Sequence, residues 1–178
     1  KLGCERIYFV ARPLSVPTVD ARIAGAREAL VRRRIEPAPD WVRLGDPADL
    51  KFVRRLAAGK QADAFICAND HTAATLMRSL ETLGVRVPRD VRVVGVDDVK
   101  YATLLSVPLT TIHQPCRDIA GIAFRTMLQR IAEPALPGRS LALTPALVVR
   151  ESCGAYLAAG ERKRTPLARG NHAVAGKR

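Results

Sequence analysis

The sequence of this 178-residue chain predicts an α/β protein with a doubly wound parallel sheet. Short runs of β-branched and aromatic residues alternate with segments whose apolar residues recur at helical spacing, as in strand–helix crossover units. One run, VRVVGVDD at 91–98, has the pattern of a buried strand that ends in Asp97 and Asp98. Because ligands bind at the carboxyl ends of strands in such sheets, these aspartates indicate a binding site. The alternative is that both aspartates only punctuate a loop.

The elements follow from local signals taken in chain order. Asp46 and Pro47 suit the N-cap and the first position of a helix, and Asn69 is a second expected cap. Gly84 closes the helix that Asn69 begins. We expect strands at 6–11, 41–44, 64–68, 91–96, 109–112, 140–143 and 147–149, and helices at 19–34, 47–58, 70–83 and 117–132.

Composition excludes several classes of protein. The formal charge is +12, but the segment 154–178 holds six basic residues and one acidic residue, and no basic patch interleaved with aromatic residues is present. We expect 154–178 to be a disordered tail. There is no apolar run long enough for a membrane span. We expect no signal peptide in this sequence, and we expect the chain to begin inside a larger protein. The scattered cysteines indicate reduced thiols and no zinc site.

Five motifs resemble one family of regulators. AND at 68–70, GVRVPRD at 84–90, VVGVDD at 93–98, PLTTIHQP at 108–115 and LVVRES at 147–152 occur in the order and spacing of the LacI/GalR family of bacterial transcription regulators. The resemblance implies the type I periplasmic-binding-protein fold, truncated at its N-terminus. Residues 1–153 would be a partial effector-binding domain, mainly its second lobe, with the helix at 117–132 belonging to the first lobe. Operator DNA would be bound only through a helix-turn-helix that this chain lacks.

The resemblance also implies the ligand site. Arg22, in ARIAG, matches an arginine that reaches a sugar hydroxyl or ligand carboxylate, and Thr18 matches a polar position before it. Asn69 and His71 match the junction of strand and helix, Asp97 an accepting carboxylate, and Gln114 a further contact in the cleft. Each has a plainer alternative: Asn69 could be only a helix cap, and Arg22 could pair with Asp20 at the surface.

Departures from the family pattern leave the ligand open. Pro47 and Val96 stand where many family members have an aromatic residue, and Cys116 stands where a bulky residue is expected. Aromatic rings commonly stack on a sugar ring. The effector is therefore expected to be a sugar, a sugar derivative such as an acidic sugar or sugar phosphate, or a purine-like metabolite.

The function predicted is that of a cytoplasmic, homodimeric regulator that senses a small molecule, with no cofactor. The alternative is a periplasmic sugar-binding protein of a transport system, which shares the fold. An enzyme is disfavoured, because no GxGxxG, GxSxG or HExxH motif occurs, and Asp97 with His71 is too little for acid–base chemistry. No metal site is predicted.

Overall fold

A single sheet organises the chain in the computed structural model, which describes residues 2–13, 16–58 and 62–157. In that part of the chain six strands lie in the order β2-β1-β3-β4-β5-β6. The first five run parallel and β6 is antiparallel to β5. The predicted fold class is confirmed. The strands are β1 (Ile7–Ala11), β2 (Val42–Leu44), β3 (Ala64–Cys67), β4 (Arg92–Asp97), β5 (Thr110–His113) and β6 (Ala146–Val148).

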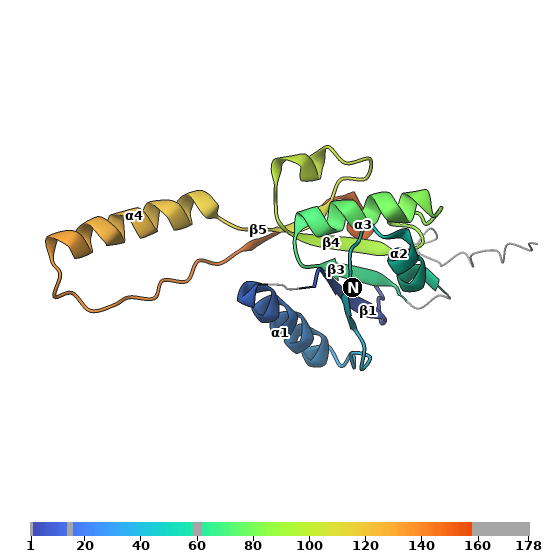
Figure 1. The fold of residues 1–178 in the computed structure, drawn as a ribbon, viewed down its shortest axis with the longest axis horizontal. Helices are drawn as coiled ribbons and strands as arrows, with labels where there is room; N and C mark the ends of the chain where they lie inside the picture. The colour runs from blue at the N-terminus through green and yellow to red at the C-terminus, as the bar shows by residue number, and fades with distance from the viewer. Residues whose placement is uncertain (1, 14–15, 59–61, 158–178) are drawn as a thin grey trace, which may run out of the picture.

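Helices cover both faces of this sheet (Figure 1). On one face, α2 (Leu50–Ala57) and α3 (Asp70–Thr82) bury Val53, Leu76 and Leu80 against the strands. On the other face, α1 (Pro17–Arg32) buries Leu30 in a smaller cluster with Phe9. Two separate apolar clusters on opposite faces are the layered arrangement that alternating strands and helices predict.

Helix boundaries differ from the predicted ones at two places. α1 begins at Pro17, where proline needs no hydrogen-bond acceptor, and Arg34 lies beyond it at φ +58°. The N-cap of α2 is Asp49, whose Oδ1 accepts from the Lys51 amide at 2.8 Å, and not Asp46 as predicted. Asp46 instead accepts from the Ala48 amide at 3.0 Å. Asp46 therefore forms an Asx turn just before the helix, and Asp49, three residues later, caps the first turn of α2.

The segment between β5 and β6 projects away from the sheet. We call residues 114–145 the arm; it contains α4 (Cys116–Ala132), and Figure 1 shows it extending beyond the other elements. No residue of α4 is buried. The strand predicted at 140–143 is wrong: these residues are irregular, and Leu141 is exposed. In the described chain they have no neighbouring strand to supply ladder hydrogen bonds, without which an extended segment is not a strand.

Two 3₁₀ turns of the described chain, η2 (Lys100–Thr103) and η3 (Glu151–Cys153), complete the compact part outside the arm, which we call the lobe. η2 follows β4, and η3 follows β6. Ser152 anchors η3, since its buried hydroxyl donates to the Val93 carbonyl at 2.7 Å and accepts from the Thr110 amide at 2.8 Å. Residues 154–157 form a turn, and the rest of the predicted tail lies outside the described residues. No helix in the described part is long and apolar enough to cross a membrane.

Candidate functional site

Asp97 is the centre of a polar cluster where the parallel strands end. It is the last residue of β4, and its Oδ1 lies 3.4 Å from Nη2 of Arg22, which is on the second turn of α1. Gln114, the first residue of the arm, donates from Nε2 to the same oxygen. Arg22 also donates to the carbonyl of Ala68, after β3, at 2.6 Å. Arg22 from α1 and Gln114 from the arm thus converge on the carboxylate of Asp97, and Arg22 pairs with Asp97 and not with Asp20.

Asp70 stabilises the turn that follows Asp97. It is fully buried at the start of α3, and its carboxylate accepts from the Thr111 hydroxyl at 2.5 Å and from the Val99 amide at 3.0 Å. Burial raises the pKa of Asp70 above its ordinary value, although these two hydrogen bonds act in the opposite direction. Asp70 therefore ties α3, β5 and the turn after Asp97 together. Gly95 permits this, because a Cβ at that position would lie 2.2 Å from Asp70 Oδ1.

The backbone turns sharply at the two aspartates. Asp97 has φ +124° and Asp98 has φ +58°, values that residues with a side chain rarely adopt. Such conformations cost on the order of 1 to 3 kcal/mol each and persist where the surroundings fix them. Here the Val99 amide donates to Asp70, and the Asp98 carboxylate binds Arg150 and His113. These contacts hold the turn, so that Asp97 and Asp98 have different partners.

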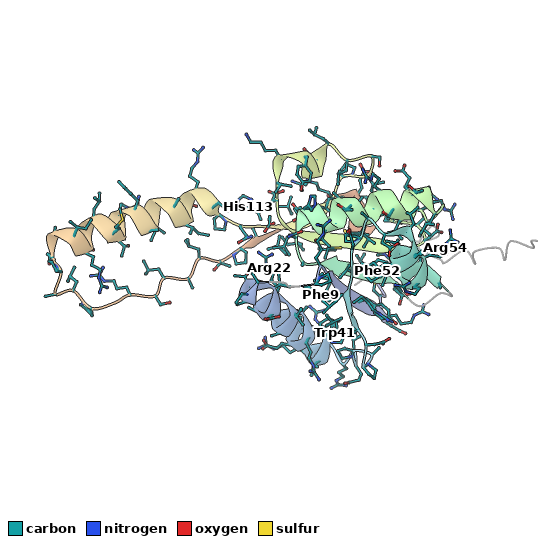
Figure 2. The ribbon with its side chains drawn as sticks, in the orientation of Figure 1. Phe9, Arg22, Trp41, Phe52, Arg54 and His113 are labelled. Atoms are coloured by element: carbon teal, nitrogen blue, oxygen red, sulfur yellow. The ribbon has the colours of Figure 1, made fainter. Side chains whose placement is uncertain are left out.

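Asp98 has partners distinct from those of Asp97. Its Oδ1 lies 2.6 Å from Nη2 of Arg150, and its Oδ2 lies 3.0 Å from Nδ1 of His113. Partial desolvation raises the pKa of Asp98, but hydrogen bonds from Arg150 and His113 outweigh it, so the pKa lies below its ordinary value. Figure 2 shows His113 and Arg22 on the same side of the molecule, where the arm leaves the sheet.

The other predicted site residues lie around this cluster without a hydrogen bond to it in the described structure. The side chain of Asn69 accepts from the Thr72 amide at 2.8 Å and so caps α3. Thr18 is exposed in the first turn of α1. His71 is exposed in the first turn of α3, beside a shallow hollow that Thr75 and Arg78 also line. Among the described residues, hydrogen bonds therefore join Arg22, Asp97 and Gln114, and none connects Thr18, Asn69 or His71 to them.

This arrangement suits the binding of a small polar molecule. The side chains of Arg22 and Asp97 are 26% and 32% exposed, so both retain access to solvent while their charges balance. A carboxylate, a guanidinium and an amide at one point offer fixed acceptors and donors to hydroxyl or N–H groups. Among the described residues, no group of His, Cys, Asp and Glu is arranged to hold a metal ion.

Comparison with known proteins identifies the family. A family model described as a periplasmic binding protein-like domain matches residues 1–153. The chain belongs to the periplasmic binding protein-like domain family. Its sequence is 37% identical over 135 residues to the HTH-type transcriptional repressor PurR of Vibrio parahaemolyticus serotype O3:K6 (strain RIMD 2210633), covering 74% of this chain and 40% of the repressor.

Solved structures place this domain among LacI-type regulators. A LacI family transcriptional regulator from Sanguibacter keddieii DSM 10542 matches at 34% identity and a TM-score of 0.75, over 86% of this chain and 61% of that one. A complex of the transcriptional regulator CelR with cellobiose matches at 31% identity and a TM-score of 0.76, over 84% and 47%. The predicted LacI/GalR relationship is confirmed. The chain spans only 40% to 61% of the length of these three proteins.

The residues that depart from the family pattern have ordinary packing roles. Pro47 is fully buried, and its carbonyl accepts from the hydroxyl of Ser79 at 2.7 Å. Val96 is half-buried within β4, and Cys116 is exposed at the start of α4. None of the three is an aromatic residue that could stack on a ligand beside the Asp97 cluster.

Sequence reasoning missed three residues that shape this edge. Arg150, His113 and Asp70 were not among the predicted site residues, yet they fix the turn that carries Asp97. A signal was available for two of them, because Arg150 lies in LVVRES and His113 in PLTTIHQP. For Asp70 the adjacent Asn69 cap suggested only a helix start, and burial became visible only in the structure.

Proposed function

We propose that this chain is part of the effector-sensing domain of a LacI-type transcriptional regulator. In this proposal residues 1–153 form mainly the second lobe, and the helix at 117–132 packs on a first lobe formed by chain outside this sequence. Two observations support the division: the segment between β5 and β6 projects away from the sheet (Figure 1), and α4 has no buried residue. DNA binding would be supplied by a helix-turn-helix segment in the full-length protein, since the PurR relative is an HTH-type repressor.

The observation that carries the proposal is the convergence of Arg22 and Gln114 on Asp97. A polyhydroxylated ligand would replace these internal contacts with its own, accepting from Arg22 and donating to Asp97. The CelR relative is described in complex with cellobiose, which favours a sugar or sugar derivative over a purine-like ligand. The charge balance of Arg22 and Asp97 also favours an uncharged ligand, because an anion would leave Asp97 unpaired.

The mechanism in this proposal is a population shift. An effector that bridges the two lobes stabilises the closed arrangement and changes operator affinity by no more than its differential affinity for the two states. The protein would act in the cytoplasm, where operator DNA is, and would not be an enzyme, as its relatives are described as repressors and regulators. The same descriptions support a regulator over the transport alternative.

We also propose a homodimer in the full-length protein. Leu104, after η2, is 81% exposed, the highest value among the large apolar side chains of the described residues. Tyr101 beside it is 40% exposed. In this proposal a second subunit covers the two side chains. The full-length Leu104→Glu variant is expected to sediment as a monomer where the wild type is a dimer, and an unchanged dimer would place the contact elsewhere.

The test of effector binding uses the full-length gene product. A panel of monosaccharides, disaccharides, sugar phosphates and purine bases is screened by thermal shift, and hits are titrated by calorimetry against wild type and Asp97→Asn. Hydrogen bonds to charged groups contribute roughly 1.5 to 3 kcal/mol each. Affinity in the variant should therefore fall by roughly tenfold to a hundredfold. Asp20→Asn, exposed on the same helix as Arg22, is the matched control. Unchanged affinity in folded Asp97→Asn would refute the site.

A further inference from the structure

We propose that the binding site continues along the sheet edge to a second charged pair, Arg12 with Asp46, and that its ligand is a neutral sugar of at least two linked rings. One ring is bound at Asp97, and Arg12 and Asp46 bind hydroxyl groups of the next ring. This inference rests on the proposed function, because it names the class of sugar that the same site would take.

Arg12 and Asp46 lie where two neighbouring strands end. Arg12 directly follows β1, and Asp46 lies two residues after β2. Nη2 of Arg12 is 3.2 Å from Oδ1 of Asp46, and the two side chains are 49% and 56% exposed. An ion pair this exposed contributes little to stability. Its position points to a ligand, because open α/β sheets bind ligands outside the carboxyl ends of their strands.

The strand register puts Arg12 level with Asp97. The Ala68 amide donates to the Val10 carbonyl at 2.9 Å, so β1 and β3 stay aligned beyond their last paired residues. Continued along the chain, the registers of β1, β3 and β4 put Arg12 beside Asn69 and Asn69 beside Asp97. Neighbouring strands are about 4.8 Å apart, so the backbones of Arg12 and Asp97 are separated by roughly 10 Å.

The backbone that carries Asp46 is held in place. The Gly45 amide donates to the carbonyl of the fully buried Ala11 at 3.0 Å. A Cβ at Gly45 would overlap the ring of Phe52, so this turn is packed closely against α2. Oδ1 of Asp46 also accepts from the Ala48 amide at 3.0 Å. The carboxylate is therefore positioned before a ligand arrives, which reduces the entropy lost on binding.

The charges of the pair favour a neutral ligand. A phosphate or carboxylate group at Arg12 would lie beside the carboxylate of Asp46 and be repelled by it. Hydroxyl groups both donate and accept, so they can bind to both members of the pair. Leu44, two residues before Asp46, is 57% exposed and offers an aliphatic surface to the apolar face of a sugar ring.

The spacing of the two pairs determines the length of the ligand. A sugar ring is about as wide as the spacing between neighbouring strands, and Arg12 and Asp97 are two strand spacings apart. A single ring bound at Asp97 therefore leaves Arg12 without a contact to the ligand. A second ring linked to the first reaches it.

The experiment compares disaccharides with their own monosaccharides on the full-length protein. Cellobiose, maltose, lactose, glucose, galactose and glucose 6-phosphate are titrated by calorimetry against wild type, Arg12→Gln and Asp97→Asn. We expect one disaccharide to bind wild type at least about tenfold more tightly than its monosaccharides. Arg12→Gln should weaken that disaccharide by about tenfold and the monosaccharides by no more than about twofold, whereas Asp97→Asn should weaken both.

Two further variants separate ligand contact from support of the fold. Asp46→Asn retains an oxygen for the Ala48 amide and should weaken the same disaccharide. It decides the matter if Arg12→Gln does not fold by circular dichroism. Arg32→Gln is the matched control, because it breaks an exposed ion pair with Glu28 at the other end of α1 and should change the affinity for neither sugar.

The outcomes distinguish this inference from the proposed function. An unchanged disaccharide affinity in Arg12→Gln, equal weakening of disaccharide and monosaccharide, or tightest binding of a monosaccharide or of glucose 6-phosphate would overturn the second charged pair as a subsite. The Asp97 site would stand in each of these cases, provided that Asp97→Asn weakens binding. If no sugar binds, or if Asp97→Asn leaves every affinity unchanged, the proposed function is refuted together with this inference.

Discussion

At the scale of single residues, the candidate site depends on side chains that are far apart in the sequence and in contact in the fold. Asp70 reaches Thr111 and Val99 across the end of the sheet, and Gly95 leaves the space that its carboxylate occupies. Each of these residues is ordinary by type. Burial makes them structurally important. A buried carboxylate needs hydrogen-bond donors, and an atom added beside it must displace the neighbouring side chain.

The first prediction concerns that space. In Gly95→Ala the new Cβ would lie 2.2 Å from Asp70 Oδ1 and 3.0 Å from Leu109 Cδ2, so the variant should be destabilised by about 1 to 3 kcal/mol. Gly25→Ala is the control, because its Cβ would meet nothing within 4 Å and alanine favours the middle of α1. Thermal unfolding of both variants measures the difference. A Gly95→Ala protein as stable as the wild type would show that Asp70 is free to move.

The second prediction concerns pH. The pKa of Asp98 is lowered in the folded protein, so its contribution to stability is present above its ordinary pKa, ~3.9, and is lost as pH falls through the lower folded value. Asp98→Asn should therefore lower the free energy of unfolding by about 1.5 to 3 kcal/mol at pH 6, and the gap should close below about pH 4. Urea unfolding at several pH values checks this. Asparagine tolerates the φ of +58°, so a gap that stays constant with pH would exclude the charge as its cause.

At the scale of elements, capping residues determine where helices start, and an adjacent strand determines whether an extended segment forms a strand. α3 begins where its sequence predicts, because Asn69 accepts from the Thr72 amide. α2 begins at Leu50 since Asp49, and not Asp46, reaches an amide of the first turn. The segment 140–143 has the composition of a strand and still forms none, as strand structure requires a partner in the right place.

The third prediction separates capping from ligand binding at Asn69. Asn69→Ala removes the acceptor of the Thr72 amide and should lower stability by about 1 kcal/mol, whereas Asn69→Ser should retain most of it. Chemical denaturation measures both. If Asn69 acts only as a cap, effector affinity in the full-length protein will be the same in Asn69→Ser as in wild type. A stable Asn69→Ser protein with weakened effector binding would restore Asn69 to the site.

At the scale of the whole molecule, the lobe and the arm differ in how they are stabilised. The lobe buries apolar clusters on both faces of its sheet, whereas α4 leaves Phe124, Leu128 and Ile131 between 50% and 67% exposed. An isolated helix of 17 residues gains little stability from its own hydrogen bonds. The arm therefore needs packing that the described residues do not provide.

The fourth prediction follows from this exposed face. The chain should associate or bind an apolar dye, and the double variant Phe124→Lys with Leu128→Lys should reduce either effect at least severalfold. Asp118→Lys is the control, because it raises the net charge by the same amount at an exposed polar position in the first turn of α4. Sedimentation velocity and dye fluorescence report the outcome. A monomer that binds no dye would show that the arm folds against the lobe in solution.

The sequence by itself determined the alternation of strands and helices, the parallel sheet and the carboxylates at its edge. It did so because apolar periodicity and helix caps are set by residues close together in the sequence. Tertiary structure alone decided that Arg22 and Gln114 meet at Asp97, and that Asp98 pairs with Arg150 from 52 residues away. These contacts depend on which strands become neighbours and on the positive φ of two aspartates, and neither is encoded in a short stretch of chain.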